Sequence, residues 1–143
     1  MRFMMLVRAN KDTEAGVLPS PEMFEAMGKY NEELVKAGVL LAADGLQPSS
    51  KGARISFDGG RPTVTDGPFA EAKELIAGYW VIQVKSKEEA VEWASRVPFA
   101  DGEALELRQV FEAGDFPEEI VTPEAAASEA RLREELERRA GQR

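Results

Sequence analysis

The chain has 143 residues, of which 43% are apolar, and this is enough for one domain with a hydrophobic core. It contains no cysteine and no histidine, which excludes disulfides, thiolate chemistry, and catalytic pairs or zinc sites that need imidazole. Its formal charge of −8 argues against nucleic acid or anionic lipid as a partner, and no apolar run is long enough to cross a bilayer. We therefore expect a cytoplasmic protein with no membrane contact, no metal and no cofactor.

The first third of the chain predicts a strand, a helix and a second strand. Ser20 and Pro21 supply an N-cap and a first helical position, and the apolar residues that follow recur at helical spacing. Gly38 is placed to end this helix as a left-handed cap. The expected order is a strand over 2–8, a polar break over 10–16, a helix up to Gly38, a strand over 39–43 and a loop over 44–52.

The middle of the chain predicts a β-hairpin, a buried strand, a helix and a last strand. The turn formers Asp58-Gly59-Gly60-Arg61 separate two short strand patterns. Ser86 and Glu89 have the spacing of a helix capping box. The expected elements are strands over 53–57 and 62–65, a strand over 78–85, a helix from Ser86 to Pro98 and a strand over 104–111.

The C-terminal segment has a different pattern. Thr122 and Pro123 open a helix that runs to about Arg139, and Leu132 and Leu136 give it only a thin apolar stripe. We expect one α+β domain over 1–115 and a helical tail over 116–143, which either frays or packs on a partner.

The order of elements indicates the fold. Two βαβ halves with a hairpin between them favour a ferredoxin-like βαβ–βαβ sandwich, an α+β fold with both helices on one sheet face. Trp80, Val81 and Ile82 are consecutive and apolar, so their strand presents apolar groups on both faces. We expect the face away from the helices to pair with a second subunit in a homodimer.

The stretch Asp66-Gly67-Pro68-Phe69, followed by AEAKELIAGYWVIQVKSKEEAVEWASRVP, resembles the DGPF branch of the YCII-related family over about the first 115 residues. The resemblance implies a dimeric α/β barrel, and the fold is similar to that of muconolactone isomerase. It also implies a functional association with an extracytoplasmic-function sigma factor. Some smaller YCII-type proteins have a proposed His-Asp pair on the first helix, but the matching helix here, MFEAMGKYNEELVKAG, has no histidine.

Polar residues that the topology brings toward one end of the sheet are the candidates for a site. Asp44 and Asp66 follow two different strands, and each also suits a turn in which its side chain bonds to backbone amides. Trp80 fits either the core or a pocket floor. Lys73 stands between Glu71 and Glu74, which also suits an exposed, ion-paired lysine. Arg54 lies in a predicted strand, where an arginine often forms a cross-strand ion pair. The expected catalytic residues are Asp66, Glu74 and Lys73, and the expected ligand-binding residues are Asp44, Arg54, Phe69 and Trp80.

Three functions remain open. The first is a small-molecule binding or sensing module, with an apolar pocket rimmed by Asp66, Arg54 and Asp44. The second is a cofactor-free lyase or isomerase, in which Asp66 or Glu74 acts as base and Lys73 or Arg54 stabilises an enolate. The third is an interaction protein whose tail helix docks on a partner. Since imidazole is absent, we favour binding over catalysis.

Overall fold

The computed structural model describes residues 1–142, which divide into two compact units. The first unit is Met1–Val110, and the second begins at Phe111. No helix within 1–142 combines the length and the apolar character that crossing a membrane requires.

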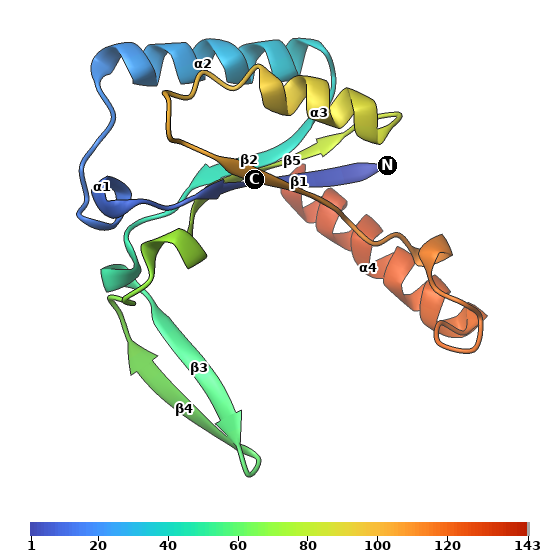
Figure 1. The fold of residues 1–143 in the computed structure, drawn as a ribbon. Helices are drawn as coiled ribbons and strands as arrows, with labels where there is room; N and C mark the ends of the chain where they lie inside the picture. Colours follow the sequence, from blue (N-terminus) through green and yellow to red (C-terminus); the bar gives the residue numbers. More distant parts are fainter. Residues whose placement is uncertain (143) are drawn as a thin grey trace. The chain divides into compact units, whose positions relative to one another are not determined.

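The first unit contains a four-stranded antiparallel sheet with helices on one face (Figure 1). The strand order is β2-β5-β1-β6, which is the ferredoxin-like order, so the expected α+β fold is confirmed. Helices α2 and α3 pack on the same side of the sheet (Figure 1). The bounds are β1 Arg2–Arg8, α1 Lys11–Glu14, α2 Pro21–Lys36, β2 Leu40–Gly45, β5 Ile76–Gln83, α3 Lys87–Ser95 and β6 Leu105–Gln109.

The core lies between this sheet and its two helices. Because side chains alternate along a strand, Trp80 and Ile82 of β5 are buried toward the helices while Tyr79 and Val81 point to the other face. The Trp80 ring meets the Tyr30 ring edge-on, with centroids 5.7 Å apart. The buried cluster consists of Phe3, Met5, Tyr30, Leu34, Val39, Trp80, Ile82, Val84 and Ala90.

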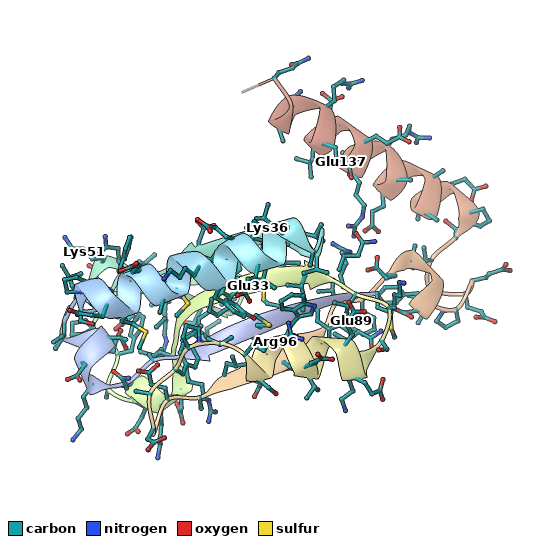
Figure 2. All side chains as sticks on the ribbon, turned by 90° about the horizontal axis from the view of Figure 1, so that it is seen from above. Glu33, Lys36, Lys51, Glu89, Arg96 and Glu137 are labelled. Carbon is teal, nitrogen blue, oxygen red and sulfur yellow. The ribbon has the colours of Figure 1, made fainter. Side chains whose placement is uncertain are left out.

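Charged residues lie on the outside of the helices. Figure 2 shows Glu33 and Lys36 at the surface of α2, with Arg96 directly after α3. The Arg96 guanidinium lies 4.7 Å from the centre of the Trp93 ring.

A hydrogen bond joins α2 to α3, because the Tyr30 hydroxyl donates to the Trp93 carbonyl at 2.7 Å. Burial raises the pKa of Tyr30 to about 12.

A two-stranded hairpin, β3 (Ala53–Asp58) and β4 (Arg61–Asp66), projects from the first unit (Figure 1). Gly59 and Gly60 form its turn with φ of 58° and 80°, which explains why two glycines are needed. Every residue of both strands is exposed. The predicted hairpin is therefore present, and it is not covered by the sheet.

Several predicted boundaries were wrong. The polar break over 10–16 contains the short helix α1, because Asn10 and Thr13 form a capping box. Strand β2 continues through Asp44 to Gly45, since Asp44 still pairs with Tyr79, and a 3₁₀ turn Ser49–Lys51 follows. Strand β5 begins and ends two residues earlier than expected, and β6 is shorter at both ends.

The predicted Ser86 capping box is only half correct. The Ser86 hydroxyl accepts from the Glu89 amide at 3.1 Å, but the Glu89 carboxylate accepts from the Lys85 amide at 2.9 Å and not from that of Ser86.

The second unit contains the predicted C-terminal helix, α4 (Pro123–Ala140). Thr122 caps it by accepting from the Ala125 amide at 3.2 Å, and Pro123 takes the first helical position. The rings of Phe111 and Phe116 stack with their centroids 4.8 Å apart. Leu132 and Leu136 are 63% and 67% exposed, so within this unit the apolar stripe of α4 is left without cover.

Candidate functional site

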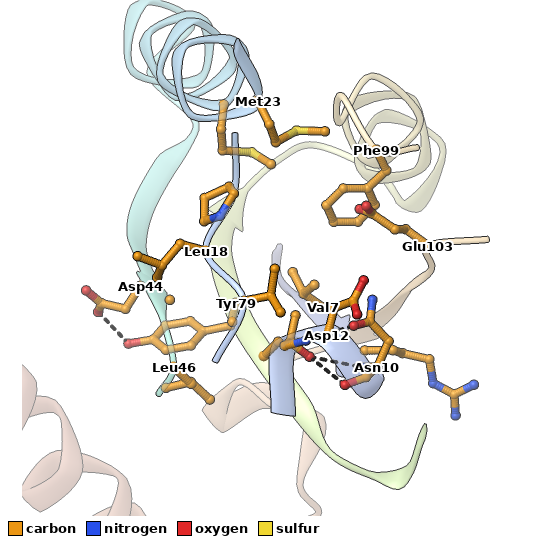
Figure 3. Close-up of a pocket in the computed structure, with 18 of the residues that line it drawn as sticks. Val7, Asn10, Asp12, Leu18, Met23, Asp44, Leu46, Tyr79, Phe99 and Glu103 are labelled. Atoms are coloured by element: carbon orange, nitrogen blue, oxygen red, sulfur yellow. Dashed lines mark hydrogen bonds between the residues drawn. The ribbon is translucent and has the colours of Figure 1, made fainter. Parts of the chain in front are cut away.

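A cavity of about 770 Å³ lies at the end of the sheet where β1, β2 and β5 meet the segment that joins α1 to α2 (Figure 3). Its apolar walls are formed by Val7, Leu18, Met23, Met27, Trp80 and Phe99. Polar side chains from α1, β2 and the segment after α3 complete the lining. A volume of this size is within the range that holds a small organic molecule.

Helix α2 places three side chains of the cavity in one row. Ser20 begins the helix by accepting from the Met23 amide at 3.1 Å. Met23, Met27 and Asn31 then follow at intervals of four residues, so they lie on one helix face. Both methionines are partly buried and line the cavity, and Met27 also packs against the core.

Trp80 and Asn31 form a polar contact at the cavity wall. The indole Nε1 of Trp80 donates to Oδ1 of Asn31 at 2.8 Å. Trp80 is 6% exposed and lines the cavity, so it belongs both to the core and to the cavity wall. Asn31 was missed by the sequence reasoning, because no local pattern shows its partner 49 positions away.

Asp44, on β2, lines the cavity and accepts a hydrogen bond from a tyrosine. The Tyr79 hydroxyl donates to Oδ2 of Asp44 at 2.8 Å (Figure 3). This hydrogen bond, with the charge of the carboxylate, raises the pKa of Tyr79. Asp44 therefore does not serve as a turn former, because its carboxylate is held by a neighbouring strand and not by backbone amides.

The Asp-Gly-Pro-Phe stretch forms a tight corner at the base of the hairpin. The Gly67 amide donates to the Gly52 carbonyl at 3.1 Å, and the following Gly67–Pro68 peptide is cis. A Cβ built on Gly67 would lie 1.8 Å from the carbonyl oxygen of Ser49, so only glycine fits here. The Phe69 amide donates to the Ser49 hydroxyl at 3.0 Å.

This corner is tied to α1 through a carboxylate. Both the amide and the hydroxyl of Ser49 donate to Glu14, the amide at 2.9 Å. These two hydrogen bonds lower the pKa of Glu14. Thr13, which adjoins Glu14, lines the cavity, so Glu14 links the cavity wall to the base of the hairpin. The sequence reasoning missed Glu14, because no local pattern shows that Ser49 is its partner.

Arg54 and Phe69 are brought together by the corner. The Arg54 guanidinium lies 4.0 Å from the centre of the Phe69 ring, in the geometry of a cation–π contact. The cross-strand ion pair that strand arginines often form is not seen at Arg54 within residues 1–142, where the residue opposite it is Thr65.

The expected catalytic residues lie outside the cavity lining. Asp66 ends β4 and is exposed, and its side chain has no hydrogen bond or ion pair within residues 1–142. Lys73 and Glu74 are exposed in a 3₁₀ turn, Ala72–Glu74, and Lys73 makes no ion pair in the described part of the chain. Asp44 and Asp66 belong to different sheets. Of the seven predicted residues, Asp44 and Trp80 line the cavity.

The acidic side chains of the described residues 1–142 do not gather into a metal centre. Residues 1–142 contain no group of three or more Asp and Glu side chains placed to hold one ion. The cavity offers a ligand apolar walls, side-chain amides and hydroxyls, a phenol, a guanidinium and separate carboxylates.

Comparisons with known proteins agree with the resemblance carried by the sequence. Residues 1–114 match the family model described as the YCII-related domain. An uncharacterised protein of Rhizobium meliloti (strain 1021) is 38% identical over 68 residues, which are 48% of this chain and 55% of that protein. The match thus spans about half of the length of this relative.

Proposed function

We propose that this chain, which belongs to the YCII-related domain family, is a small-molecule binding module whose ligand enters the cavity beside α2. The observation that carries the proposal is the cavity of about 770 Å³ with apolar walls and a few oriented polar groups. Catalysis by carboxylates is the less supported alternative, because Asp66, Lys73 and Glu74 lie outside the lining.

A ligand screen followed by residue mapping tests this function. A ligand at a hundred times its Kd stabilises the folded protein by about 2.7 kcal/mol, which a thermal-shift assay detects. Bound compounds should shift the amide NMR signals of Met23, Met27 and Trp80. Binding that maps instead to Phe69 and Arg54 would locate the site at the hairpin base and contradict the proposal.

A pair of adjacent substitutions on α2 provides the control. Met23 faces the cavity, whereas Phe24 is 74% exposed on another face of the same helix. Met23→Trp should fill part of the cavity and weaken the binding of every compound found in the screen. Phe24→Trp makes a change of similar kind outside the cavity and should leave binding unchanged.

We further propose that two copies associate through the sheet face opposite α2 and α3. Met4, Leu6, Tyr79 and Val81 lie on that face, and each is partly buried. Light scattering at micromolar concentration should give the mass of a dimer. Val81→Glu should shift the protein toward a monomer, while a monomeric wild type would refute the association.

The resemblance to the DGPF branch supports a regulatory role for such a module. An extracytoplasmic-function sigma factor is the proposed partner, which requires this protein to be cytoplasmic as well. Size-exclusion chromatography of the two purified proteins, with and without a ligand from the screen, would test it. Separate elution under both conditions would remove this partner.

A further inference from the structure

The orientation of the Asn31 amide gives the cavity a chemical preference. Indole is a hydrogen-bond donor only, so the atom that Trp80 Nε1 meets at 2.8 Å must be the carbonyl oxygen of Asn31. The oxygen is thereby engaged with the protein. The amide nitrogen, Nδ2, is the group of this side chain that remains to meet a ligand.

The Nδ2 group has donor capacity that the protein does not use. Within residues 1–142 it donates to no acceptor, although Asn31 is partly buried. No side-chain polar atom in this part of the chain is both fully buried and unsatisfied, so Nδ2 retains access to the space beside it. Asn31 lines the cavity, and a ligand oxygen placed there would accept from Nδ2.

The charges around the cavity disfavour an anion. Asp12, Asp44 and Glu103 contribute three carboxylates to the lining, whereas Arg8 contributes one guanidinium. Asp12 and Glu103 lie on the same side of the cavity in Figure 3. Since the chain as a whole has a formal charge of −8, a negatively charged ligand is repelled both on approach and at the lining.

We propose that the ligand is an uncharged, mainly apolar small molecule that presents a carbonyl or similar acceptor oxygen to Asn31. This inference rests on the proposed function and names the ligand class of the same cavity. Met23, Met27 and Phe99 contact the apolar body, Asn31 selects the oxygen, and Trp80 fixes the orientation of Asn31. Asn31 is in this sense the specificity-determining residue of the site.

Two probes of nearly the same shape separate charge from size. 4-Phenylbutan-2-one is an uncharged ketone, and 3-phenylpropionate replaces its terminal methyl ketone by a carboxylate. Binding is followed through the indole N–H signal of Trp80, while that of Trp93, the second tryptophan, serves as an internal reference. The ketone should bind about tenfold more tightly than the carboxylate, because the lining is acidic.

Asn31→Asp tests the hydrogen bond with little change in shape. Aspartate still accepts from the Trp80 indole but cannot donate to a ketone oxygen. The affinity for 4-phenylbutan-2-one should fall about tenfold, as expected for the loss of one hydrogen bond to the ligand. The Trp80 indole signal should keep its hydrogen-bonded position, which shows that the fold is retained.

Asp12→Asn is an independent variant at an exposed position. It removes one carboxylate from the lining and should therefore improve the binding of 3-phenylpropionate more than that of the ketone. Equal affinity of both probes for the wild type, or an Asn31→Asp variant that binds the ketone undiminished, would overturn the inference. So would a Trp80 indole signal that does not move when 4-phenylbutan-2-one is added to the wild type. In those cases a positive ligand screen would still leave the binding function standing.

Discussion

Replacing Gly67 by alanine should destabilise the protein by more than a usual surface substitution. The new Cβ would lie 1.8 Å from the Ser49 carbonyl oxygen and 2.6 Å from its carbon, and both are backbone atoms that cannot rotate away. The backbone around Gly67 or Ser49 must therefore shift, and overpacking of this kind lowers the free energy of unfolding by about 1–3 kcal/mol or more. The φ of Gly67 is not in the left-handed region, so its backbone conformation does not require glycine. The requirement comes from the close approach of the two chain segments.

The matched control is Gly28→Ala in the middle of α2. A Cβ on Gly28 has no neighbour within 4 Å, and alanine favours a helix over glycine by about 1 kcal/mol. The same chemical change should therefore raise stability at Gly28 and lower it at Gly67.

Urea unfolding followed by circular dichroism measures both variants, with amide exchange at Phe69 as a local readout. The Phe69 amide donates to the Ser49 hydroxyl, so it should lose protection in Gly67→Ala. If Gly67→Ala unfolds within about 0.5 kcal/mol of the wild type and Phe69 stays protected, the close contact does not hold the corner in the way described.

Four further predictions concern ionisable groups. Asp66→Asn should change stability by less than about 0.5 kcal/mol in thermal unfolding, because the Asp66 side chain has no partner within residues 1–142; a larger loss would restore its role as a turn former. The pKa of Glu14 is lowered, so its contribution to stability is present above its ordinary pKa of 4.5 and is lost as the pH falls through the lowered value. The free energies of unfolding of the wild type and Glu14→Gln should therefore converge as the pH is lowered. An ultraviolet titration should show a raised pKa for Tyr79 that returns toward 10.0 in Asp44→Asn, and no change in that variant would contradict the hydrogen bond. Because the pKa of Tyr30 is raised from 10.0 to about 12, its contribution is complete below pH 10 and is lost as the pH rises to 12, a loss that Tyr30→Phe should not show.

The sequence predicted those parts of the fold that depend on short-range chemistry. Ser20 and Thr122 begin their helices as expected, because a side-chain oxygen reaches an amide only three residues away. Gly38 has φ of 73° where a left-handed cap was expected, and Gly59 with Gly60 forms the predicted turn. These signals, with the apolar run of Trp80, Val81 and Ile82, were sufficient for the order of elements.

The contacts of the candidate site could not be predicted in the same way. The Asn31–Trp80 and Glu14–Ser49 pairs join residues 49 and 35 positions apart, and neither asparagine nor glutamate on a helix carries a local mark of its partner. Asp44 was expected in a loop because aspartate is common in turns, whereas pairing with β5 extended the strand through it. Long-range pairing overrode local preference there.

The hairpin of β3 and β4 has a further consequence for local unfolding. Two strands alone are marginally stable in water, and Ile55, Phe57 and Val64 are 53%, 76% and 64% exposed, so little burial opposes the opening of this ladder. Its amides should exchange with deuterium well before those of β1 and β5, and its tip should be the first place that a protease cuts. Slow exchange along the hairpin would instead mean that another polypeptide shields its apolar residues in solution.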